Sequence, residues 1–117
     1  MEHYEKETEV YVFDPVKFIL QKGKITEWHS YCYYSYKIAI NEEEHWYDSR
    51  YVAVDPKNLL IRLLWDEQQV AREAKKSMAL HNEKANELCW ILGELDASIN
   101  IKEELDNYEK KVRGYGY

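Results

Sequence analysis

The stretch from Asp66 to Ile99 constrains this chain most, because it contains no proline and a single glycine, Gly93. Apolar or small side chains recur in it at steps that alternate between three and four residues, which is the spacing of an amphipathic helix with heptad-like packing. More than half of its residues are Ala, Glu, Lys, Leu or Gln, all strong helix formers. The pattern predicts a long helical arm. Its recurring positions are Val70, Ala74, Ser77–Met78, His81, Ala85, Leu88, Leu92, Leu95 and Ile99.

A helix of this length extends about 50 Å, at 1.5 Å per residue. A small neighbouring domain cannot cover all of it, so the apolar seam needs another partner: the last helix folded back, a second copy of the chain, or both. We expect a homodimer or higher homo-oligomer, with Leu88, Leu92, Leu95 and Ile99 as the interface between copies. The alternative is an intramolecular hairpin formed by a break near His81–Asn82. On the seam itself, His81 reads as a core or interface histidine.

The first half of the chain has a different pattern, rich in β-branched and aromatic residues. In residues 33–40, Tyr34, Tyr36, Ile38 and Ile40 alternate cleanly with the residues between them, so one face of that strand is expected to point to a core and the other to solvent. Short strands are predicted at 9–13, 16–20, 25–32, 33–40, 45–48 and 51–54, with turns at Gln21–Lys24 and Asn41–Glu44. Strands this short and closely spaced favour a small antiparallel β-barrel or a strongly twisted sheet.

The period becomes helical at Asp55–Pro56, where Asp55 is suited to cap a helix and Pro56 to occupy its first position. Asn100, followed by Glu103, marks the start of a last, short helix. The expected class is therefore α+β. The expected divisions are an antiparallel β subdomain at 1–55, a helical arm and dimerisation region at 56–112, and a tail at 113–117.

The charge balance limits the partners. The chain carries a net charge of −6 at pH 7, and duplex DNA binding is not expected because such binding depends on neutralising phosphates. An acidic protein suits a basic surface on another protein. The acidic N-terminal segment does not resemble a secretion signal, and the apolar runs are too short to span a bilayer, so a cytoplasmic location is expected. Cys32 and Cys89 read as small buried hydrophobes in a reducing compartment.

We find no sequence pattern for catalysis. The four histidines are scattered without metal-ligand spacing, the serines lack a nucleophile-elbow context, and the isolated glycines form no phosphate-binding loop. The sequence therefore predicts a protein that is not an enzyme and needs no metal or cofactor.

The most informative cluster is aromatic and falls between residues 28 and 51. A core this small needs large side chains, and Tyr34, Tyr36 and one tryptophan are assigned to it. The rest are read in three ways: a protein-binding hot spot, a platform for stacking nucleotide bases with Arg50 or Arg62 on phosphate, or side chains that merely face solvent or a helix. The candidate binding residues are Trp28, Tyr31, Tyr33, Trp46, Tyr47, Arg50 and Arg62.

The β half resembles the small SH3-like barrels of short phage and mobile-element proteins, in the segments 10–13, 22–25, 34–38 and 46–47 and the helix start at 55–56. The resemblance implies a binding scaffold rather than a reaction. Small acidic phage proteins that block a host defence, including anti-CRISPR proteins, combine a short sheet with helices in a similar way. A phage-type inhibitor that binds a protein effector in the host cytoplasm is therefore the first functional hypothesis. The second is an oligomer that sequesters a nucleotide or cyclic-nucleotide immune signal, and the third is a virion assembly protein.

Overall fold

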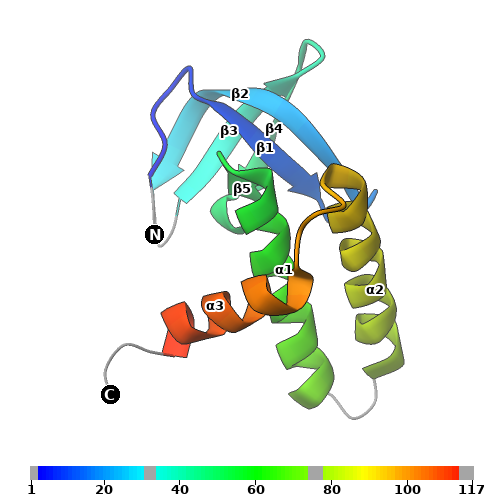
Figure 1. The fold of residues 1–117 in the computed structure, drawn as a ribbon. Helices are drawn as coiled ribbons and strands as arrows, with labels where there is room; N and C mark the ends of the chain where they lie inside the picture. Colours follow the sequence, from blue (N-terminus) through cyan, green and yellow to red (C-terminus); the bar gives the residue numbers. More distant parts are fainter. Residues whose placement is uncertain (1–2, 31–33, 74–77, 114–117) are drawn as a thin grey trace. The chain divides into compact units, whose positions relative to one another are not determined.

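The computed structural model describes residues 3–30, 34–73 and 78–113 (Figure 1). It confirms the α+β class, with an antiparallel sheet followed by three helices. The chain forms two compact units, residues 1–59 and 60–117. The elements are β1 (Glu9–Asp14), β2 (Ile19–Ser30), β3 (Tyr34–Ile40), β4 (Glu43–Asp48), the 3-10 helix η1 (Ser49–Tyr51), β5 (Val52–Ala53), α1 (Pro56–Glu73), α2 (Met78–Leu95) and α3 (Ile101–Arg113).

The strands of the first unit form one open antiparallel sheet in the order β4-β3-β2-β1-β5. Strands β1 to β4 follow one another as a meander, and β5 returns to pair with β1 (Figure 1). Within the described residues, β4 and β5 each have one neighbouring strand, so the sheet does not close. The predicted antiparallel sheet is therefore confirmed. These strands form an open sheet and not a closed barrel.

Strand β2 is the longest strand and passes straight through Gln21–Lys24, where the sequence predicted a turn. That prediction was wrong because Gly23 is needed for packing and not for a left-handed backbone. Its φ is not positive. A Cβ atom at this position would lie 2.6 Å from Ile38 Cγ2 and 2.7 Å from the carbonyl oxygen of Ala39. Gly23 therefore lets β3 pack closely against β2.

The turns of the sheet lie at two other places. Between β1 and β2, one Asp14 carboxylate oxygen accepts hydrogen bonds from the backbone N–H of Val16 (2.9 Å) and of Lys17 (3.0 Å). Between β3 and β4, the two loop residues Asn41 and Glu42 have φ values of 51° and 71°. Positive φ at both central residues is the hallmark of the hairpin turn that matches the twist of the flanking strands.

One face of the sheet holds the core of the first unit, which follows from the alternation of side chains along each strand. Tyr36 and Ile38, both predicted to face inward, are fully buried, and Ile25 pairs with Ile38 across β2 and β3. The buried cluster comprises Val10, Val12, Ile25, Tyr36, Ile38 and Val52, with Tyr4, Tyr34, Ile40 and Tyr47 packed against it.

The predicted helix starts are confirmed. Helix α1 begins at Pro56, and the Asp55 carboxylate accepts a hydrogen bond from the backbone N–H of Lys57 at 2.9 Å. Helix α3 begins at Ile101, and the Asn100 side-chain oxygen accepts a hydrogen bond from the backbone N–H of Glu103 at 3.1 Å. Among the described residues, no helix is both long enough and apolar enough to cross a membrane.

The long arm predicted over Asp66–Ile99 is replaced by a hairpin of α1 and α2 (Figure 1). His81 Nδ1 lies 2.6 Å from Glu67 Oε2. Residues fourteen positions apart on one continuous helix would be separated by about 21 Å, so the chain must fold back between them. The hairpin alternative was therefore correct, but α1 ends at Glu73 and α2 begins at Met78, before the predicted break at His81–Asn82.

The hairpin also buries part of the predicted interface between copies within the single chain. Leu88 and Leu92 are 1% and 0% exposed in the single chain, so they are core residues and not a free seam. Leu95 is 38% exposed, and Ile99 is half-buried beyond the end of α2. In α1 the buried side of the helix differs from the predicted seam by one residue, because Ala71 is buried and the predicted seam residue Val70 is exposed.

We expect Gly23→Ala to destabilise the sheet by about 1–3 kcal/mol, because the added methyl group must displace Ile38 or the β3 backbone. Gly93→Ala is the matched control, since a Cβ atom there meets nothing within 4 Å. It should stabilise α2 by up to about 1 kcal/mol. Urea unfolding of both variants measures the two changes, and a stabilising Gly23→Ala would contradict the close packing of β2 and β3.

We expect Leu92→Glu to cost at least about 4 kcal/mol, because it places an unpaired charge at a fully buried site. The matched control Leu95→Glu puts the same charge on the exposed part of α2 and should change the stability by no more than about 0.5 kcal/mol. Circular dichroism and thermal unfolding distinguish the two. A stable, well-folded Leu92→Glu variant would instead support the original prediction that Leu92 lies between copies.

Candidate binding surfaces

The register of the sheet separates the predicted aromatic cluster onto two faces. Trp28, Tyr36 and Tyr47 lie in one cross-strand row on the core face. Trp46 is the residue before Tyr47, so its side chain points to the opposite face, where it pairs across the strands with Lys37. The structure therefore does not bring Trp28 and Trp46 together as one surface.

On the core face, an aromatic cluster forms around His3, near the last residues of β2 and the first residues of β3. The His3 ring stacks on Tyr34 at 4.5 Å between centroids and meets the edge of Trp28 at the same distance. Trp28 remains 38% exposed. The Tyr36 hydroxyl oxygen accepts a hydrogen bond from the backbone N–H of Tyr4 at 3.1 Å. These contacts tie the N-terminal segment to the sheet, so this part of the cluster is structural.

Burial changes the acidity of the core tyrosines. It raises the pKa of Tyr36 above its ordinary value of 10.0, and the hydrogen bond from Tyr4 opposes this rise only in part. Burial also raises the pKa of Tyr47, with a further contribution from the charge of Asp14. Both hydroxyls therefore stay protonated at neutral pH and are poor candidates for proton transfer there.

The outer face of the sheet carries a more accessible group. Trp46 is 51% exposed on β4. Beside it, Lys37 Nζ lies 3.5 Å from Glu27 Oε2 and 3.9 Å from Glu44 Oε2. Glu44, two residues before Trp46, is exposed on the same face of the strand. The resulting surface is a large aromatic side chain with an excess of carboxylates around it.

The remaining predicted binding residues are dispersed. The guanidinium of the exposed Arg50, in η1, lies 5.0 Å from the centroid of the Tyr51 ring. Arg62 is half-buried in α1, within the unit 60–117, so it does not belong to the sheet. Tyr31 and Tyr33 lie outside the described residues.

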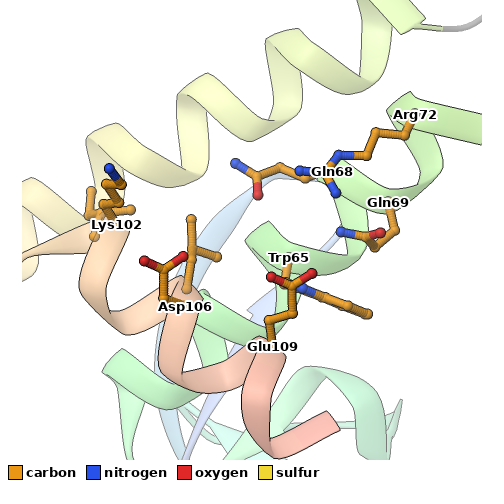
Figure 2. A pocket seen from close by; sticks show the side chains of 9 residues that line it. Trp65, Gln68, Gln69, Arg72, Lys102, Asp106 and Glu109 are labelled. Atoms are coloured by element: carbon orange, nitrogen blue, oxygen red, sulfur yellow. The ribbon is translucent and has the colours of Figure 1, made fainter. Parts of the chain in front are cut away.

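The helical unit contains an open pocket of about 320 Å³ between α1 and α3 (Figure 2). Figure 2 shows Gln68, Gln69 and Arg72 extending from α1, and Lys102, Asp106 and Glu109 from α3. Trp65 forms part of the wall and packs edge-on against Tyr108 at 5.5 Å between centroids. The volume is at the lower end of the range for small-molecule sites.

The electrostatics of this pocket are mixed, because Arg72 and Lys102 line it together with Asp106 and Glu109. Glu109 is engaged by Arg113, whose Nε lies 3.4 Å from Glu109 Oε1. Next to the pocket, burial raises the pKa of Tyr108, and the charge of Asp66 adds to this effect. Sequence reasoning allowed the last helix to fold back on the arm, but it named no pocket there.

A second feature missed by sequence reasoning is the exposed face of α2. Trp90 is 68% exposed and Leu80 is 53% exposed. The sequence signal for this face was the position of Trp90 one turn from Glu87 and Glu94 and two turns from Glu83, on the polar side of the helix.

The described residues contain no group of three or more His, Cys, Asp or Glu side chains arranged to hold a metal ion. Cys89 is a free, half-buried thiol whose pKa is raised by burial, which makes it a weak nucleophile. Cys32 lies outside the described residues. No protein family, curated protein sequence or solved structure matches this chain.

Proposed function

We propose that this chain is a non-enzymatic protein-binding module, and more specifically a phage-type inhibitor that binds a protein effector of a host defence system. The observation that carries the proposal is Trp46, a half-exposed tryptophan on an edge strand that is rich in carboxylates. Tryptophan is among the residues most enriched in binding hot spots. The more specific role as an inhibitor rests on the resemblance to small acidic phage proteins.

The position of Trp46 on β4 favours protein binding for a second reason. In the described part of the chain, β4 pairs only with β3, so its other edge offers backbone N–H and C=O groups to an added strand. An incoming extended segment would pair with β4 and contact Trp46 on the outer face. Lys37 is neutralised by Glu27 and Glu44, so the net charge of this face favours a basic segment.

The scaffold that we propose is an SH3-like sheet. The register between β2 and β3 shifts between Ile25 and Glu27, which is the irregularity of a β-bulge. Bulges bend a strand and increase its twist, and this is how short sheets curl. A basic nucleic-acid channel of a defence effector would complement an acidic protein with a net charge of −6. We expect the encounter to take place in the host cytoplasm.

We expect Trp46→Ala to raise the dissociation constant for an effector by at least roughly 30-fold, the loss typical of a hot-spot residue. The probe is a panel of purified RNA-guided nucleases of CRISPR systems, with binding measured at low salt by interferometry and inhibition measured by DNA cleavage. Trp90→Ala is the matched control, because it removes an exposed tryptophan from the other unit. If the wild type forms no complex with any effector of the panel, the inhibitor proposal is wrong.

The pocket between α1 and α3 favours a second candidate function, the sequestration of a nucleotide or cyclic nucleotide. Trp65 offers an aromatic wall, and Arg72 and Lys102 offer two cations for phosphate. The carboxylates of Asp106 and Glu109 weaken the attraction for an anion, so this function ranks second.

We expect a nucleotide that binds this pocket, at a hundred times its dissociation constant, to stabilise the protein by about 2.7 kcal/mol. Arg72→Ala should abolish the shift, because it removes a phosphate-binding cation. Arg50→Ala, which removes the same charge from the other unit, should leave the shift intact. Thermal-shift measurements with mononucleotides and cyclic nucleotides test this, and an unchanged melting temperature at millimolar concentration would exclude the function.

A further inference from the structure

One face of α2 combines apolar and acidic side chains that are exposed. We call it the Trp90 face and define it by Leu80, Glu83, Glu87, Trp90 and Glu94, which are all exposed. Their spacing of three, four, three and four residues places them on one stripe of the helix. Leu80 and Trp90 are the two apolar side chains of this stripe, about 15 Å apart along the axis.

Gly93 lies one turn after Trp90, beside this stripe. Glycine is the least favourable residue in a helix apart from proline, so it needs a reason there. The fold supplies none, because the φ of Gly93 is not positive and a Cβ atom would meet nothing within 4 Å. The missing side chain instead leaves the helix backbone uncovered beside this stripe, where another helix can approach closely.

The complementary chemistry is present in the same chain, in the last turn of α3. Lys110 and Lys111 are exposed there, and Val112 is 49% exposed between them and Arg113. The Arg113 guanidinium is engaged within the chain, because its Nε lies 3.4 Å from Glu109 Oε1 and its Nη2 lies 3.5 Å from Gln69 Oε1. We call Lys110, Lys111 and Val112 the α3 tip. It offers two cations and one apolar side chain, which matches the carboxylates and the tryptophan of the Trp90 face.

We propose that the Trp90 face of one molecule binds the α3 tip of a second copy, and that the contact is reciprocal, so that a closed dimer forms. Both surfaces belong to the unit 60–117. Each is exposed in the single chain, so neither covers the other within one molecule. In the dimer the lysine ammonium groups pair with Glu83 and Glu87. A lysine stem packs on the Trp90 ring, whose face attracts the cation.

This contact differs from the interface predicted from the sequence, whose central residues Leu88 and Leu92 are buried. It is also independent of the proposed effector site, because Trp46 lies in the other unit. The contact is reciprocal because the two molecules are identical. In a dimer with a two-fold axis, each molecule uses both of its surfaces, so no surface is left to bind a third molecule.

The test is a charge swap on the full chain, measured by light scattering on a sizing column at about 100 mM salt. The wild type should have twice the mass of the 14.1 kDa chain. Glu83→Lys/Glu87→Lys and Lys110→Glu/Lys111→Glu should each be monomeric, and their equimolar mixture should restore the dimer. In that mixed dimer, one contact carries the reversed charges on both sides and the other contact is of the wild type.

The matched control separates a specific contact from general attraction between oppositely modified proteins. Glu9→Lys/Glu43→Lys changes the net charge by the same amount as Glu83→Lys/Glu87→Lys, but on exposed residues of the sheet. It should remain dimeric alone, and its mixed dimer with Lys110→Glu/Lys111→Glu should be much weaker than the dimer of the two charge-reversed variants, because one of its two contacts brings carboxylates together. A mixed dimer with this control that is as stable as the dimer of the two charge-reversed variants would overturn the proposal.

Two further variants examine the centre of the Trp90 face. Trp90→Ala should raise the dissociation constant of the dimer at least about tenfold without changing the melting temperature of the monomer, because its side chain is exposed. Gly93→Ala should make the helix more stable and yet weaken the dimer, a combination that a purely structural role would not produce. A wild type that stays monomeric at about 100 µM, or a dimer that survives both charge reversals, would overturn the proposal. Trp46→Ala should leave the dimer intact. A loss of dimer formation and a loss of effector binding can therefore be told apart.

Discussion

The close contact between β2 and β3 at Gly23 is the constraint on which the sheet depends. The first half of β2 pairs with β1 and its second half pairs with β3, so β2 joins the two sides of the sheet. Gly23 lies near the junction of these two halves, where a side chain would collide with Ile38 and Ile40. Ile38 can then occupy the core with Ile25 and Tyr36. Strand order, core and exposed face all follow from this register.

In the helical unit, the corresponding contact joins Glu67 on α1 to His81 on α2. Both side chains are largely shielded from solvent, at 23% and 20% exposed. Once α2 folds back, Leu88 and Leu92 are buried in the single chain, and the side of α2 that carries Trp90 is left exposed. The surfaces available to a partner are therefore a result of the hairpin. Trp46 on the sheet and Trp90 on α2 share the same chemistry, an exposed indole near carboxylates, and this is the basis for proposing binding rather than catalysis.

Sequence reasoning succeeded where the signal is local. Asp55 and Asn100 were recognised as helix caps because a cap depends on a few adjacent residues and one side-chain hydrogen bond. The inward side of β3 was recognised because alternation belongs to a single strand. It failed at Gly23, since glycine in a turn and glycine at a close strand contact look the same in one sequence. Of the predicted binding residues, Trp46 and Arg50 are exposed and Tyr47 packs on the core, a distinction that strand register decides.

The sequence by itself determined the α+β class, the helix starts and the strongly acidic charge, because these depend on composition and on spacings within single elements. Only the tertiary structure decided that the stretch around Asp66–Ile99 is a hairpin, since a helical period is the same whether the apolar side packs on a neighbouring helix of the same chain or on another molecule. It also decided which tryptophans are exposed, because the exposure of a side chain is fixed by the elements that pack against it. The long helix that the heptad-like pattern predicted is thus two helices held by Glu67 and His81.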